Sequence, residues 1–274
     1  MYFLWAHPYL SVAFWLFYVV TYFNQPEKSG RWSLDWLRAW SGWRRISTCV
    51  MQNQKLLNDC APDTKLLFAV APNTSLLTLF WSFGLHGQPS LRRLDTVFAV
   101  PRILLLIPLL RDVLMAAGAV EDDFATVQSL LFKGRAVCWC PSGMEGCLMD
   151  QSPDRALVRA LSEEMSQECL DKNIHVAPVI FQGETARYVP VKNALLRQVQ
   201  QYCFSRWAFP WPLAFRIDRS VDVVTYISVP ISPRTFHDDG DWQGFIRKIS
   251  DSWADYGNST DRGLAVLPHD SNSI

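Results

Sequence analysis

The sequence predicts an α/β protein whose mostly parallel sheet is flanked by helices. Short apolar runs alternate with longer stretches of helical periodicity, which is the pattern of strands joined by crossover helices. With 274 residues, 49% of them apolar, the chain can bury a substantial core, and we expect one large domain rather than two small ones. The runs that we expect to form strands are 66–70, 95–101, 136–140, 176–181 and 221–229.

The first 23 residues contain no Asp, Glu, Lys or Arg and are largely apolar or aromatic, which is long enough to embed in a bilayer. No basic segment precedes this run and no small-residue cleavage site follows it, so a retained anchor is favoured over a removed signal peptide. A buried core helix is the alternative. We therefore expect an N-terminal membrane-embedded helix over 1–23.

Tryptophan and arginine alternate in the segment 24–60, which we expect to be helical and interfacial. Such helices lie in the headgroup layer of a membrane, and an ordinary amphipathic core helix is the alternative. Because the basic residues follow an uncharged anchor, the positive-inside rule places the rest of the chain in the cytosol. The residues concerned are Trp32, Trp36, Trp40, Trp43, Arg31, Arg38, Arg44 and Arg45.

The α/β domain is expected over 61–267, with a disordered tail over 268–274. Its helices are predicted near 73–84, 104–117, 123–133 and 153–172, the last starting at Ser152-Pro153-Asp154, where Ser suits the N-cap and Pro the first helical position. A final amphipathic helix places Trp242, Phe245, Ile246, Ile249 and Trp253 on one face.

The cysteine count and the charge balance exclude several classes of function. Seven cysteines with no CxxC pair argue against a disulfide framework and a zinc site, and we expect neither a metal nor a bound cofactor. Cys138 and Cys140 fall on an expected buried strand, where cysteine behaves as a small apolar residue. With 26 basic and 26 acidic residues, nothing suggests attraction to nucleic acid.

Three blocks of sequence point to a known family. Residues 26–31 read Pro-Glu-Lys-Ser-Gly-Arg, and residues 108–118 read Pro-Leu-Leu-Arg-Asp-Val-Leu-Met-Ala-Ala-Gly. The third block joins Gly143-Met144-Glu145 to the run 176–184, which ends in Phe-Gln-Gly-Glu. In this order they resemble the diacylglycerol, monoacylglycerol and wax-alcohol acyltransferases of the endoplasmic reticulum, which esterify a hydroxyl from acyl-CoA. The resemblance covers about residues 9–258.

This resemblance implies a glycerolipid acyltransferase-like fold at the endoplasmic reticulum membrane, with acyl-CoA as a co-substrate and with membrane lipids or an acylglycerol as partners. It also leaves open a homo-oligomer, or a hetero-oligomer with an active relative. The residues that it assigns to substrate or acyl-CoA binding are Arg111, Asp112, Gly143, Glu145, Gly183 and Glu184. From the residues alone, a local ion pair is favoured for Arg111-Asp112 over a phosphate clamp, and the two glutamates could equally complete structural turns.

The chain departs from the family where the chemistry should lie. The family carries His-Pro-His-Gly after its first core strand, and the residues here are Ala71, Pro72, Asn73 and Thr74. The Phe-Arg that precedes the second block in the family is also replaced, by Leu105-Leu106. A base that takes the proton of the attacking hydroxyl contributes about a hundred- to ten-thousand-fold in rate. Alanine cannot act as one, and an asparagine amide can only orient or stabilise an oxyanion.

Two functions therefore remain open. The first is a pseudoenzyme that binds lipid or acyl-CoA, or that regulates an active relative. The second is an active O-acyltransferase with a relocated base. His86, which follows the altered motif by 15 residues, is the best substitute among the histidines. The others, less suited by their positions, are His7, His175, His237 and His269.

Overall fold

A computed structural model describes the central part of the chain and shorter segments on either side of it. The residues described are 12, 16, 48–51, 64–70, 76–84, 91, 93–107, 110–140, 168–184, 188–190, 193–207, 215–217, 223–237 and 241–259. The predicted anchor lies outside these residues except for Val12 and Leu16, which are helical and exposed. The predicted tail lies outside them entirely.

A seven-stranded sheet forms the centre of the fold. Five neighbouring strands run parallel, so the expected mostly parallel α/β sheet is confirmed. Two strands at one side run the other way, because β9 pairs antiparallel with β6. In spatial order the strands are β1 (Thr48–Met51), β9 (Val224–Ile227), β6 (His175–Gln182), β2 (Leu66–Val70), β5 (Val137–Trp139), β3 (Val97–Val100) and β4 (Ala119–Glu121).

All five runs expected as strands contain one, but two further strands of the central sheet, β1 and β4, were not anticipated, and neither was the separate pair β7 (Tyr188–Pro190) and β8 (Phe215–Ile217). β1 lies in the segment 24–60, so residues 48–51 of that predicted interfacial helical segment form an edge strand, and its other residues lie outside the described part of the chain. β4 has only three residues, too few to show an alternating pattern. The run 221–229 contains β9, whose antiparallel direction the pattern did not predict. The strands β7 and β8 pair antiparallel with each other.

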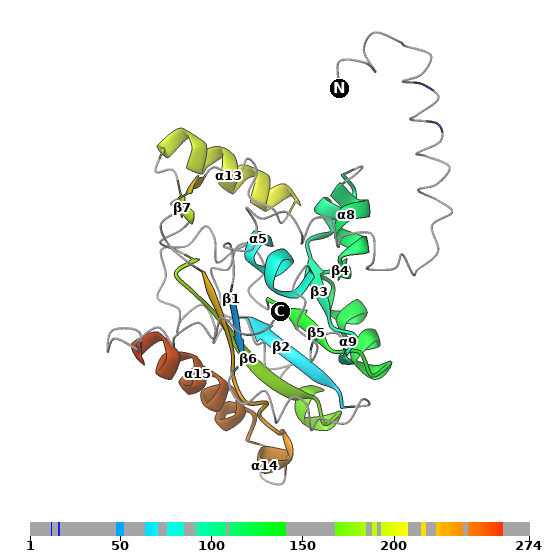
Figure 1. The fold of residues 1–274 in the computed structure, drawn as a ribbon, viewed down its shortest axis with the longest axis vertical. Coiled ribbons are helices and arrows are strands. Elements are labelled where there is room, and N and C mark those ends of the chain that lie inside the picture. The colour runs from blue at the N-terminus through cyan, green and yellow to red at the C-terminus, as the bar shows by residue number, and fades with distance from the viewer. Residues whose placement is uncertain are drawn as a thin grey trace, which may run out of the picture.

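Helices cover both faces of the sheet (Figure 1). The prediction for 123–133 is confirmed by α9, and its N-cap Asp123 accepts a bond from the backbone of Thr126. The prediction for 104–117 becomes two helices, α7 and α8. Of the prediction for 153–172, residues 168–171 are helical and 153–167 lie outside the described residues. The helices are α5 (Leu76–Leu79), the π-helical turn η2 (Phe80–Gly84), α7 (Arg102–Leu105), α8 (Leu110–Ala116), α9 (Phe124–Phe132), α13 (Ala194–Trp207), α14 (Arg234–His237) and α15 (Trp242–Ser259).

Alternation along the fully buried strand β2 divides the core into two layers. Leu66, Phe68 and Val70 face the side covered by α5, η2, α7 and α8. Leu67 and Ala69 face the opposite side, where α9 and α15 lie. A strand that is apolar on both faces belongs in the middle of a three-layer α/β sandwich, which is where β2 is found.

Among the helices of the described residues, none has both the length and the apolar composition needed to cross a bilayer.

Candidate functional site at the carboxyl end of the sheet

The altered motif and both candidate glutamates follow strands that end at the same edge of the sheet. β2 lies between β5 and β6 and runs parallel to both, with Ala69 opposite Trp139 and Val70 opposite Val179. Ala71 to Thr74 come directly after β2, and Gly143 and Glu145 follow β5, but these positions lie outside the described residues. Parallel α/β sheets bind their ligands at this edge.

Glu184 is held at this edge in a buried position. Gly183 follows β6 directly and has a backbone φ of 81°, a left-handed conformation that glycine adopts without strain. This turn carries Glu184 inwards, where it is only 4% exposed. The hydroxyl Oγ1 of Thr78, in α5, donates to Glu184 Oε1 at 2.5 Å. A buried carboxylate needs such a donor, and this one comes from the helix that begins just after the altered motif.

A second buried polar pair lies beside the first. Ser82 in η2 follows Thr78 by four residues, so the two side chains share one side of the helical segment. The hydroxyl oxygens of Ser82 and Thr225 are 2.7 Å apart, and both residues are fully buried. Thr225 lies on β9 opposite Phe181, close to the end of β6. We call Thr78, Ser82, Glu184 and Thr225 the polar cluster.

The polar cluster offers one carboxylate and three hydroxyls. Hydroxyls can donate hydrogen bonds to a carbonyl or an oxyanion, but they do not take up a proton near neutral pH. Within the described residues, no group of three His, Cys, Asp or Glu side chains is arranged to hold a metal ion. The cluster can therefore bind and orient a polar group, and Glu184 is its one ionisable member.

The block 108–118, predicted to bind substrate, places its charged pair on α8. Arg111 and Asp112 are both half-buried there. Gly118, the last residue of the block, has a φ of 92° and turns the chain from α8 into β4. The glycine therefore has a structural reason to be present.

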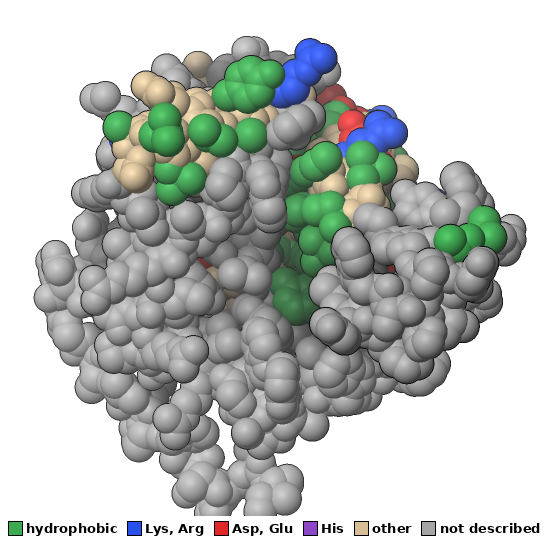
Figure 2. Space-filling view, turned by 90° about the horizontal axis from the view of Figure 1, so that it is seen from above, with side chains coloured by type: hydrophobic (Ala, Val, Ile, Leu, Met, Phe, Trp, Pro, Cys, Tyr) green, Lys and Arg blue, Asp and Glu red, His purple; other side chains and the backbone are tan. Residues whose placement is uncertain are grey.

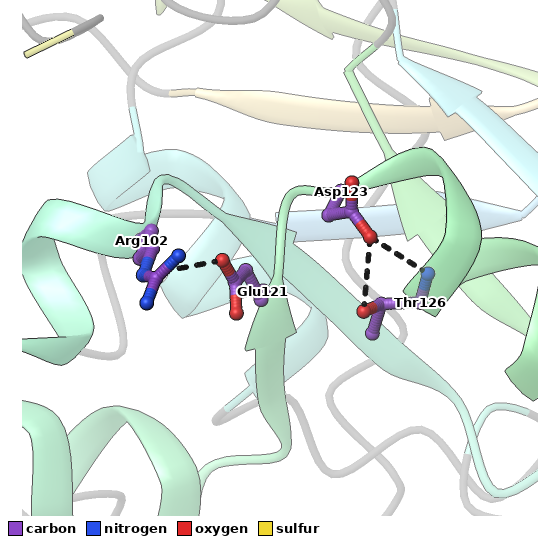
Figure 3. A network of polar contacts seen from close by, with 4 residues as sticks. All are labelled: Arg102, Glu121, Asp123 and Thr126. Carbon is purple, nitrogen blue, oxygen red and sulfur yellow. Dashed lines mark hydrogen bonds and ion pairs between the residues drawn. The ribbon is translucent and has the colours of Figure 1, made fainter.

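At the end of β4, three consecutive acidic residues have partners within the protein. Glu121 pairs with Arg102 at 3.6 Å, and Asp123 accepts from Thr126, as Figure 3 shows. Asp122 accepts from the indole of Trp139, and its pKa is raised chiefly by burial, with a smaller contribution from the charge of Asp123. These carboxylates stabilise the end of the sheet and the start of α9.

The described histidines lie away from the polar cluster. His175 begins β6, opposite Leu66, at the amino end of both strands. Burial, followed by the positive charge of Arg234, lowers its pKa. His237 ends α14, which lies at the lower end of the sheet in Figure 1. His86, the favoured substitute base, lies outside the described residues together with His7 and His269.

The sequence patterns indicated Glu184 but did not indicate the other members of the polar cluster, Thr78, Ser82 and Thr225. Two of these carried a readable signal, because Thr78 and Ser82 are polar residues four apart in an otherwise apolar stretch, Leu-Leu-Thr-Leu-Phe-Trp-Ser-Phe. Such spacing on a buried helix indicates a polar contact inside the protein. Thr225 lies on a β-strand, where threonine is common, and its position carried no such signal.

Comparisons of the chain with protein-family models, with curated proteins and with solved structures found no match.

Proposed function

We propose that this chain is a diacylglycerol acyltransferase-like protein of the endoplasmic reticulum membrane, with its globular part in the cytosol, that binds acyl-CoA or an acylglycerol without histidine-dependent acyl transfer. In this role it acts as a lipid-binding or regulatory protein, alone or paired with an active relative. The resemblance of the three sequence blocks suggests the family, and the replacement of the motif by Ala71-Pro72-Asn73-Thr74 removes the expected base.

The observation that carries the proposal is the hydrogen bond from Thr78 to Glu184. In the acyltransferase reading, a carboxylate at this edge would be expected to hold a catalytic histidine or a substrate headgroup. Here the buried carboxylate of Glu184 accepts from a threonine of α5 and so ties the helix after the motif to the end of β6. Because Glu184 already accepts a hydrogen bond from Thr78, we favour a site that binds a ligand over a site in which this carboxylate transfers a proton.

The test uses the full-length protein in detergent micelles or nanodiscs. Transfer of a labelled acyl group from acyl-CoA to diacylglycerol is measured beside the binding of a thioether analogue of acyl-CoA, which cannot react. We expect binding without transfer. Absence of binding would refute the proposal.

Variants separate this proposal from an active enzyme. Transfer by the parent chain that is abolished by His86→Ala would establish the relocated base in place of the pseudoenzyme. Glu184→Gln keeps an oxygen that can accept from Thr78, so we expect it to preserve binding, whereas Glu184→Ala should weaken it. Transfer by the parent that is lost in Glu184→Gln would instead identify this carboxylate as the base.

Restoring the motif measures how much of the catalytic site is left. The triple variant Ala71→His, Asn73→His and Thr74→Gly supplies the missing bases and the glycine. We expect weak or absent transfer, because Leu105-Leu106 shows that neighbouring positions have also changed and catalytic groups act as a unit. Robust transfer by this variant alone would show that the rest of the site is intact.

A further inference from the structure

Two exposed apolar surfaces lie at the same end of the molecule as the polar cluster. One is on α13, where Leu195 and Tyr202 are 73% and 68% exposed and Val199 is exposed between them. The other surrounds the start of α8, and its exposed residues are Leu106, Ile107, Leu110 and Val113. Figure 2, seen from above, shows apolar side chains in two neighbouring groups on this face, with a hollow beside one of them. We call the two surfaces together the apolar rim.

The apolar side chains of α13 form a stripe on the side that faces away from the protein. Leu195, Val199 and Tyr202 recur at spacings of four and three, so they share one face of the helix. Cys203, on a neighbouring face, is buried. An amphipathic helix of a water-soluble surface normally turns its apolar face towards the core, and this one also presents apolar residues outwards.

The positive charge of α13 indicates which kind of surface binds this apolar stripe. The segment 193–207 contains Arg197 and Arg206 and no acidic residue, in a chain whose net charge is zero. By contrast, α15 carries two basic residues, Arg247 and Lys248, and two acidic ones. Arginine beside exposed leucine, valine and tyrosine matches the surface of a bilayer with anionic headgroups, because the apolar groups enter the acyl boundary while the arginines meet the phosphates.

We propose that the apolar rim docks on an anionic phospholipid surface, so that the carboxyl end of the sheet faces the membrane. This orientation would let an acyl chain or acylglycerol pass from the bilayer towards the polar cluster without crossing water. The inference deepens the proposed function by naming the face that meets the lipid. It can fail independently, because a protein held by its N-terminal segment alone could still bind acyl-CoA.

The test is photolabelling of the full-length protein in phosphatidylcholine vesicles with and without phosphatidylserine. The probe is a phospholipid with a diazirine near its headgroup, and mass spectrometry locates the labelled peptides. We expect labelling within 193–207 and 102–116 that rises with phosphatidylserine, and little labelling around Phe132. Phe132 is a matched exposed aromatic at the other end of the sheet, where Lys65 and Lys172 lie over its ring at 4.8 and 5.9 Å.

Variants of exposed residues test the two contributions separately. Arg197→Gln with Arg206→Gln should lower labelling of α13 about five-fold per arginine, the factor expected for a basic residue near an anionic surface. Leu195→Ser with Val199→Ser should lower it about ten-fold for each side chain. The controls Phe132→Ser and Arg247→Gln with Lys248→Gln should leave it unchanged.

Two outcomes would overturn the inference. The first is labelling confined to the N-terminal region, and the second is a chemical cross-link between α13 helices of two copies that persists without phosphatidylserine, which would make the stripe a self-association surface. Binding of the thioether acyl-CoA analogue is measured on the same samples. Retained binding with no labelling of the apolar rim would reject the docking face and leave the proposed function standing.

Discussion

The two faces of the central sheet are built differently, although they share the strand β2. On one side, α9 and α15 are regular helices of nine and 18 residues that pack apolar side chains on the sheet. Polar contacts described on this side, such as Ser228 with Ser252 and Gln128 with Glu168, are only partly buried. On the other side, α5, η2, α7 and α8 are short, and the polar cluster is fully enclosed.

This difference separates stability from binding. A long helix with an apolar face is stabilised by burial of that face and does not require a buried polar contact. Buried polar groups and π-helical turns reduce that gain, and they concentrate at functional sites. The regular side therefore supports the sheet, whereas the irregular side carries the candidate site.

Removing one phenylalanine from each face should give the largest effects and test this separation. Phe68 pairs with Phe83 on the irregular side and Phe245 with Phe236 on the regular side, with ring centroids 5.5 and 5.6 Å apart. We expect Phe68→Ala and Phe245→Ala each to lower the free energy of unfolding by about 3–5 kcal/mol, measured by urea denaturation. Only Phe68→Ala should weaken binding of the acyl-CoA analogue by the folded protein. Equal losses of binding would remove the distinction between the faces.

A smaller effect is expected when the donor to Glu184 is removed. Thr78→Val keeps the shape of the side chain and deletes the hydroxyl that bonds the buried carboxylate. The loss of a bond to a charged group predicts destabilisation by about 2 kcal/mol. Thr235→Val is the matched control, because Thr235 is exposed and donates only to a nearby backbone carbonyl. Similar unfolding midpoints for both variants would show that the Thr78 contact contributes little.

The second polar pair should show a weaker coupling. A double-mutant cycle with Ser82→Ala and Thr225→Val isolates the bond between two neutral hydroxyls. We expect a coupling energy of about 1 kcal/mol, below the effect of the charged pair. A cycle with Ser228→Ala and Ser252→Ala provides the corresponding value on the regular side, where partial exposure should make it smaller. A coupling energy between Ser228 and Ser252 as large as that between Ser82 and Thr225 would contradict the proposed difference between the two faces of the sheet.

The smallest effect concerns pH and the amino end of β6. Because burial and Arg234 lower the pKa of His175, the folded state disfavours its charged form. The stability that this contributes is present above pH 6.5, the unfolded value, and is lost as the pH falls through the folded pKa. His175→Gln should flatten this dependence in unfolding measurements, and Arg234→Gln should raise the histidine pKa seen by NMR. An unchanged slope in His175→Gln would assign the pH dependence to another group.

The sequence predicted the core more completely than it predicted the site. Apolar runs identified the strands because a strand buried on both faces, such as β2, must be apolar throughout. The same pattern could not give the direction of β9, since burial does not depend on the direction in which a strand runs. It also missed α13, a largely exposed helix that packs little of its length on the core. Helix and strand periodicity is visible in a sequence only where one face of the element is buried, and most residues of α13 are exposed.

The polar cluster was only partly predictable for a related reason. Glu184 stood out because it follows a strand and a glycine, and that context was confirmed. Its bond to Thr78 joins residues 106 positions apart, and the choice of that threonine depends on how α5 lies over the sheet. Local patterns contain no information on such packing. The placement of Ala71 and Glu145 beside Glu184 remains a prediction from the shared edge of the strands.

The π-helical turn at Phe80–Gly84 makes this segment sensitive to its length. Ser82 reaches Thr225 while the next residue, Phe83, packs on Phe68. Deleting Phe80 or Trp81 would move every later residue of the turn back by one position along the helix. Phe83 would then face Thr225 in place of Ser82, and Gly84 would take the place of Phe83, so the aromatic contact with Phe68 would be lost. We therefore expect homologous chains that preserve these two contacts to tolerate substitutions elsewhere in the turn. An insertion or deletion in the turn would have to be compensated by a second one nearby.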